Sequence, residues 1–252
     1  MNFVKSVDFI VEKEKLDNFA ELIIEIKLKF NEKIGFDLNY LSDIEEWHKK
    51  QSKKFSEVLT RFEKEEIVAM AINIEWVVFI SNFFWNKSKD EQICIILHEL
   101  GHIKYPISKV CSFLTNHSGD NMVKEYLADS YIKEVSKEFA QKRFTFWFQS
   151  FNEKFDISAF KKEFDFDEFS NLIFHYFNLY YFKKITNLDL IENSLILIKR
   201  KFLSNLNEFY IQEITQLILE YLDYPYNWEK GKALDELLDK AENNILPLSI
   251  SR

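Results

Sequence analysis

The spacing of apolar residues predicts helices in the first quarter of the chain. In residues 13–31 (KEKLDNFAELIIEIKLKFN) the apolar positions recur every three or four residues, which places them on one face of an amphipathic helix. A second helix is predicted to begin at Ser42, because Ser42 and Glu45 have the spacing of a capping box, and to run to about Arg61.

The pattern changes in residues 67–81 (IVAMAINIEWVVFIS), where β-branched and aromatic residues follow one another. Such a composition is typical of strands. It predicts either one long strand or a hairpin that turns near Asn73–Glu75. This segment directly precedes a further predicted helix, residues 88–105.

The chain from about Phe144 onward is predicted to be helical and is rich in Phe, Tyr, Leu and Ile. The expected helices cover residues 168–183, 188–204, 207–222 and 231–243. The whole pattern predicts an α+β protein. Its first domain, residues 1–143, holds a small β-sheet, and residues 144–252 form a mostly helical region that packs on this domain or binds a partner.

Composition agrees with a folded and mostly helical protein. The chain has 252 residues, of which 47% are hydrophobic and 17% aromatic, so it can bury a sizeable core. Its 4 glycines and 3 prolines leave few turn-forming positions, which favours helices with short connections. The formal net charge of −8 argues against direct binding of nucleic acid, because such proteins concentrate Lys and Arg.

Cysteine content and hydropathy bear on the cellular compartment. Cys94 and Cys111 do not form a disulfide framework, and Cys94 lies on an apolar helix face where a small buried hydrophobe is expected. No apolar run approaches the roughly 18 residues needed to cross a bilayer, and no signal-peptide pattern is present. We therefore expect a reduced, cytoplasmic protein with no membrane partner.

Helix signals are strongest in residues 88–105 (SKDEQICIILHELGHIKY). Ser88 and Glu91 have the spacing of a capping box, and acidic residues in the first turn favour the positive end of the helix dipole. Pro106 ends the run, because the residue before a proline disfavours helical backbone. Gly101 lowers helix stability relative to alanine, so a closely packed neighbour or a substrate backbone is the expected reason for it.

This predicted helix carries His98, Glu99 and His102 in the order H-E-x-x-H. Two residues four apart lie on the same face of a helix, at a separation that one zinc ion can bridge. Glu99 lies beside the first histidine, where its carboxylate can act as a general base without being a ligand. The alternative is a buried helix with two hydrogen-bonded histidines.

A third ligand is expected on the next predicted helix, since catalytic zinc takes three protein ligands. This helix has Asp120 as its N-cap and begins at about Asn121 (NMVKEYLADSYIKEV). Glu125 is the favoured ligand, because a helix that turns back after the motif would bring it to the metal. Asp129, one turn later, is expected to support the site by accepting the N–H of His98 or His102.

His117 is the rival third ligand. It lies in a segment of turn-forming residues between the two helices, where it could complete a three-histidine site, stabilise an oxyanion, or lie at the surface. His48 is expected at the surface of its helix, and His175 in the core or at the surface.

The sequences ILHELGHIKY and EYLAD resemble the zincin-type metallopeptidases, and most closely the ImmA/IrrE-like domain. That family has a helix with H-E-L-G-H and, roughly 20–30 residues on, a second helix with an E-x-x-A pattern. The matching positions are His98, Glu99, His102, Glu125 and Ala128. The resemblance covers residues 65–140, and the E-x-x-A-D pattern also occurs in other gluzincins. It implies a zinc endopeptidase that, in the better-understood members, cleaves a DNA-binding repressor.

These observations predict a zinc metalloendopeptidase that hydrolyses a protein or peptide substrate, for which the resemblance suggests a transcriptional regulator. An extended substrate can bind to such an enzyme as an added strand at a sheet edge near the metal. The second hypothesis is a non-catalytic binding protein that keeps a structural or vestigial zinc site and acts through its helical half. Glu99 argues against it, because a structural site has no need of that carboxylate.

Overall fold

In the computed structural model the chain forms two compact units. It describes residues 5–41, 67–72, 76–105, 119–154, 190–203 and 208–223, and single positions between 176 and 183 and at 236 and 240. The first unit consists of Met1–Pro106 and Ala128–Arg143, and the second of Ile107–Leu127 and Phe144–Arg252. The sequence-based division also falls between residues 143 and 144, whereas here residues 107–127 join the second unit.

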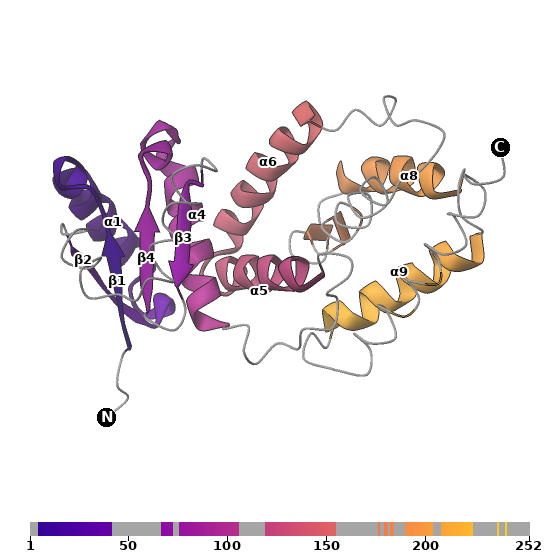
Figure 1. Cartoon of the computed structure of the whole chain (residues 1–252), viewed down its shortest axis with the longest axis horizontal. Helices are drawn as coiled ribbons and strands as arrows, with labels where there is room; N and C mark the ends of the chain where they lie inside the picture. Colours follow the sequence, from indigo (N-terminus) through magenta and orange to yellow (C-terminus); the bar gives the residue numbers. More distant parts are fainter. Residues whose placement is uncertain are drawn as a thin grey trace. The chain divides into compact units, whose positions relative to one another are not determined.

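The described part of the first unit contains a mixed four-stranded sheet with the strand order β2-β1-β4-β3 (Figure 1). The strands are β1 (Lys5–Ile10), β2 (Phe36–Leu41), β3 (Ala69–Ile72) and β4 (Val77–Ile80). β1 runs parallel to both β2 and β4, and β3 runs antiparallel to β4. β3 is therefore an outer strand among the described strands, and β4, its only neighbour there, is the strand that precedes the H-E-x-x-H helix in the sequence.

Of the two predicted arrangements for residues 67–81, the hairpin is observed. Ala69 pairs with Ile80 and Ile72 with Val77, while residues 73–75 lie outside the described part of the chain. All four residues of β4 are buried, as expected for an inner strand. The strands predicted from the β-branched and aromatic composition of this segment are therefore confirmed.

β1 and β2 are not predicted from the sequence. In β1 the buried Val7 and Phe9 alternate with Ser6 and Asp8, which is the strand period, but the alternation extends over only these few residues. The polar residues form a hydrogen bond between the strands: the side-chain amide of Asn39 on β2 donates to the Ser6 hydroxyl on β1 at 2.6 Å. Parallel pairing is non-local and leaves no hairpin signal in the sequence.

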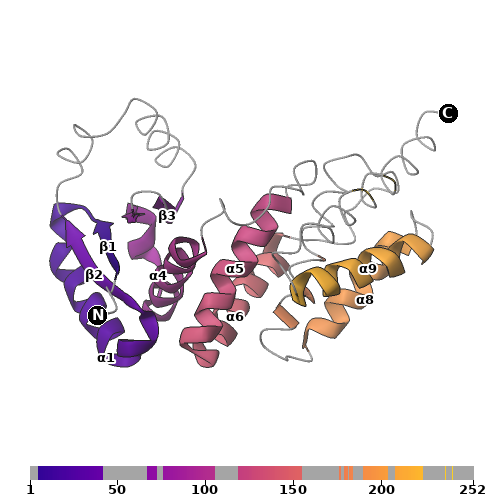
Figure 2. The same cartoon turned by 90° about the horizontal axis from the view of Figure 1, so that it is seen from below.

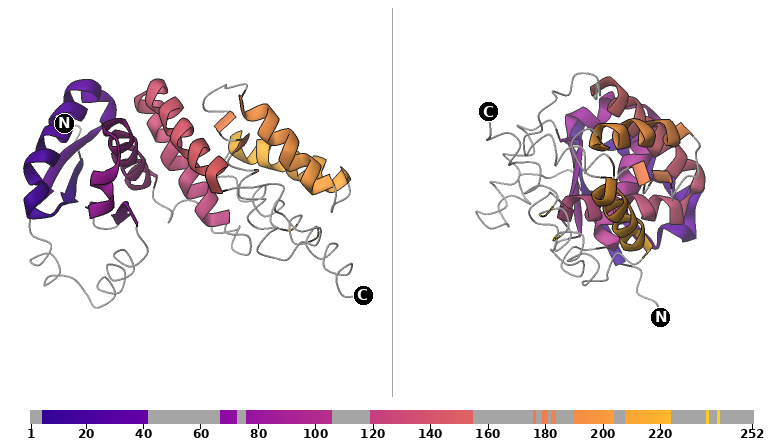
Figure 3. Two further views of the ribbon diagram at one scale, coloured as in Figure 1. Left: turned by 90° about the horizontal axis from the view of Figure 1, so that it is seen from above. Right: turned by 90° about the vertical axis from the view of Figure 1, so that its right-hand side faces the viewer.

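The amphipathic helix predicted over residues 13–31 is present as α1 (Leu16–Ile34), preceded by a short 3-10 turn. Figure 3 shows this helix beside the strands of the sheet. Its apolar face is buried there, and the ring of Phe19 lies 5.3 Å from that of Phe9 on β1. The helix ends at Gly35, whose φ of 66° is the left-handed conformation favoured by glycine at helix C-termini. The chain then enters β2, so α1 is the crossover between two parallel strands.

The H-E-x-x-H helix is α4 (Lys89–Lys104), and its predicted capping box is present. The Ser88 hydroxyl accepts from the Glu91 N–H, and the Glu91 carboxylate accepts from the Ser88 N–H at 3.0 Å. The helix ends at Lys104, shortly before Pro106 in the sequence. One side of α4 contacts β3, which fixes the motif helix beside the outer strand.

Two further helices follow, α5 (Gly119–Val135) and α6 (Lys137–Lys154). α5 begins at Gly119, so Asp120 lies in its first turn and the predicted N-cap is wrong by about two residues, a usual error at helix ends. The start of α6 is not predicted, although Ser136 is an N-cap by its geometry, since its hydroxyl accepts from the Phe139 N–H.

The described part of the second unit is helical. α8 (Leu190–Leu203) and α9 (Glu208–Asp223) lie within two residues of the predicted helices, and they contact each other (Figure 2). Tyr176 is buried and its hydroxyl lies 2.6 Å from that of Thr215 on α9. The helix predicted over residues 42–61 falls outside the described residues, as do His48, His117, His175 and Cys111. No helix among the described residues is long and apolar enough to cross a membrane.

Candidate metal centre

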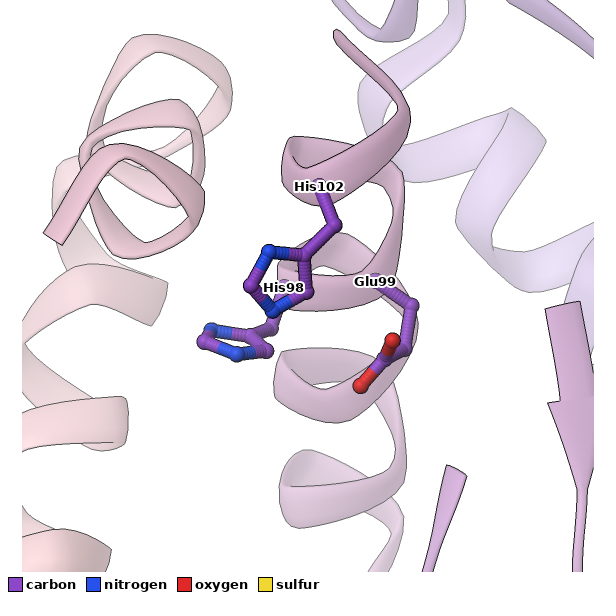
Figure 4. Close-up of side chains that lie close together, drawn as sticks. All are labelled: His98, Glu99 and His102. Atoms are coloured by element: carbon purple, nitrogen blue, oxygen red, sulfur yellow. The ribbon is translucent and has the colours of Figure 1, made fainter. Parts of the chain in front are cut away.

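The two histidines of α4 project from the same side of the helix, one turn apart (Figure 4). Their ring centroids are 4.7 Å apart and the rings are nearly perpendicular. Glu99 projects from the adjacent side, and the nearest ligand atoms of His98, Glu99 and His102 all lie within 4.8 Å of one another. Two imidazole nitrogens and a carboxylate oxygen are therefore close enough for one cation to reach all three.

Close packing of α4 on α5 explains Gly101. A Cβ built on Gly101 would lie 2.5 Å from the carbonyl oxygen of Ala128 and 2.6 Å from its Cα. Both distances are well inside van der Waals contact, so the predicted close neighbour is confirmed as the reason for the glycine. The contact brings the backbone of α5 against the turn of α4 that carries His98 and His102.

We expect Gly101→Ala to lower the free energy of unfolding by about 2 kcal/mol. Overpacking costs about 1–3 kcal/mol, toward the upper end here because backbone atoms cannot turn aside, and the gain in helix propensity offsets about 1 kcal/mol. Urea denaturation of wild type and variant measures the difference. Adding Ala128→Gly should not restore stability, since the clashing atoms belong to the backbone of Ala128. A Gly101→Ala variant as stable as wild type would contradict this packing.

Asp129 holds the ring of His98. Its Oδ1 lies 2.6 Å from Nδ1 of His98, and both side chains are buried, at 3% and 7% exposure. A carboxylate can only accept a hydrogen bond, so Nδ1 carries the proton. Nε2 is then the ring nitrogen whose lone pair can bind a cation, an arrangement common for histidines that bind metal.

Two partners of the site had not been recognised in the sequence. The backbone N–H of Ala71, on the outer strand β3, donates to Oε2 of Glu99 at 2.8 Å. Arg143 on α6 donates through Nε to Oδ1 of Asp129 at 3.1 Å. The partners in the first contact are 28 positions apart in the sequence, and those in the second are 14 positions apart. No local sequence pattern predicts contacts over such separations.

The remaining candidates lie as follows. Glu125 is partly buried on α5, four residues before Asp129, and belongs to the second compact unit. His117 lies outside the described residues.

Cys94 is buried as predicted, and burial raises the pKa of its thiol to about 12. It is therefore protonated at neutral pH and is suited neither to binding a metal nor to nucleophilic chemistry.

No protein-family model, curated protein or solved structure matches this chain. The function must therefore be argued from the site itself. Its chemistry is defined by two imidazoles that can share a cation, a neighbouring carboxylate held by a strand edge, and a buried carboxylate behind one imidazole.

Proposed function

We propose that the protein is a zinc-dependent metalloendopeptidase of the zincin type, similar to the ImmA/IrrE-like family. The observation that carries the proposal is the cluster of His98, Glu99 and His102, in which the histidines share one side of α4 and Glu99 lies beside them. Its protein substrate would be a transcriptional regulator, as the family resemblance suggests, and its site of action the cytoplasm.

The donor set suits zinc, which binds imidazole nitrogen and carboxylate oxygen in catalytic sites. His98 and His102 supply the first two ligands in this proposal, and Glu125 the third. Glu125 is proposed from the sequence, because it begins the E-x-x-A-D pattern whose last residue, Asp129, contacts His98. The carboxylate of Asp129 holds Nδ1 of the His98 ring, which leaves Nε2 as the nitrogen that would bind the cation.

Bound zinc would supply a Lewis acid that polarises the scissile carbonyl and activates water. Glu99 would take the proton from the attacking water and deliver it to the leaving amine. The N–H of Ala71 holds Oε2 of Glu99, so Oε1 is the oxygen left to exchange the proton. A substrate bound along the outer strand β3 would lie next to this carboxylate, since β3 itself contacts it.

A second candidate follows from the same cluster. Because an oxygen of Glu99 lies within 4.8 Å of the histidine ligand atoms, Glu99 could bind the metal directly. The centre would then be a structural zinc site in a non-catalytic binding protein, and the helical half would act on the partner. The Ala71 hydrogen bond favours the first proposal, because it holds the Glu99 side chain beside the outer strand along which a substrate would bind.

Proteolysis that depends on zinc is the test of the proposed function. The full-length protein, loaded with zinc, is incubated with a library of unstructured peptides, and new termini are identified by mass spectrometry. We expect cleavage that 1,10-phenanthroline abolishes and that added zinc restores. Cleavage that persists without metal would contradict the proposal, as would a zinc-loaded protein that cuts none of the peptides.

A further inference from the structure

We infer that Arg143 is a positioning residue of the metal centre: acting through Asp129, it fixes the ring of His98 and so increases the affinity for zinc. The inference rests on the proposed function for the identity of the cation. It concerns a residue on α6, outside both stretches that carry the family resemblance, ILHELGHIKY and EYLAD.

The contact geometry places two donors on one oxygen. Oδ1 of Asp129 lies 2.6 Å from Nδ1 of His98 and 3.1 Å from Nε of Arg143. An arginine side chain has five N–H donors in a rigid plane and always carries its charge, so it defines the position of a carboxylate more sharply than a neutral donor would. The position of this oxygen in turn sets the rotation of the imidazole.

Burial strengthens the effect of the arginine on Asp129. The side chain of Asp129 is 3% exposed, whereas that of Arg143 is 25% exposed. A carboxylate removed from water is strongly destabilised unless charge and hydrogen bonds compensate it. Arg143 provides both from the partly exposed side. Without Arg143, we expect Asp129 to be held less firmly, and the acceptor that orients the His98 ring would be less well fixed.

The adjacent residue offers a matched control. Lys142 is also a cation on α6, but its partners are Asp90 at 2.9 Å and Glu138 at 2.7 Å, and not Asp129. Its side chain is 32% exposed, which is close to that of Arg143. Truncating Lys142 therefore removes a similar charge from the same helix and leaves the contact with Asp129 in place.

The affinity of the full-length protein for zinc is measured by competition with a chromogenic chelator. Loss of a hydrogen-bond partner behind a metal ligand typically weakens binding by about 10–100-fold. We expect Arg143→Ala to weaken zinc binding by about 10-fold, Arg143→Lys to recover part of this loss, and Lys142→Ala to bind as wild type does. Arg143→Gln, which keeps a donor and removes the charge, replaces the alanine variant if that variant does not fold.

A double-mutant cycle separates positioning from general stability. If Arg143 acts through Asp129, Arg143→Ala should change zinc affinity less than twofold in an Asp129→Asn background. An equal effect in both backgrounds overturns the inference, as does an Arg143→Ala variant that binds zinc like Lys142→Ala. If the zinc affinity depends on Arg143 as expected but the wild-type protein cuts no peptide, the proposed function alone is refuted. Wild type that binds no zinc refutes both.

Discussion

Glu99→Gln is expected to lower the rate of peptide cleavage by about 10²–10⁴-fold, the usual contribution of a general base, while the zinc content stays that of wild type. Glutamine has the shape of glutamate, and its amide oxygen can still accept from the Ala71 N–H. The site should therefore keep its geometry. What is lost is the oxygen that takes the proton from water.

Two measurements on the same samples test this expectation, the initial rate of cleavage and the zinc content per chain. Glu138→Gln is the control, because Glu138 is an exposed glutamate on α6 that pairs with Lys142 and is not a member of the cluster of His98, Glu99 and His102. Full activity in Glu99→Gln would reject the mechanism. Loss of zinc together with activity would show that Glu99 is a ligand, and would favour the structural site instead.

Glu125→Ala is expected to weaken zinc binding by more than the roughly 10–100-fold typical of losing a partner behind a ligand. The reason is that a direct ligand would be removed and two histidines alone bind zinc poorly. His117→Ala should bind zinc as wild type does. Both affinities are measured by chelator competition. The reverse result, with His117 required and Glu125 dispensable, would make the centre a three-histidine site.

The motif helix could be predicted from the sequence because the residues that define its ends lie close together in the chain. The capping box of Ser88 and Glu91 is contained within four residues, and the observed helix begins where this pattern places it. Gly101 indicated a close neighbour, because glycine lowers the stability of a helix and is expected there only where packing leaves no room for a side chain. The hairpin was available as one of two alternatives, because residues 67–81 are rich in strand-forming residues.

The parts that were missed depend on contacts between distant segments. β1 and β2 pair in parallel across the α1 crossover, and such pairing has no turn motif to mark it. The N–H of Ala71 is a backbone group, which looks the same at every position of a sequence. Arg143 resembles any other cation on an amphipathic helix, until the fold places it beside a buried carboxylate. These are the contacts that orient the side chains of the motif.

The zinc content of the purified 252-residue chain is the decisive measurement, because every role proposed for His98, His102 and Glu99 depends on a bound zinc ion. The protein is dialysed against zinc, passed over a chelating resin and measured by elemental analysis, beside a His98→Ala/His102→Ala variant whose folding is checked by circular dichroism. We expect about one zinc ion per chain in wild type and none in the folded variant. A wild type that retains no zinc, or a variant that retains as much as wild type, would contradict it.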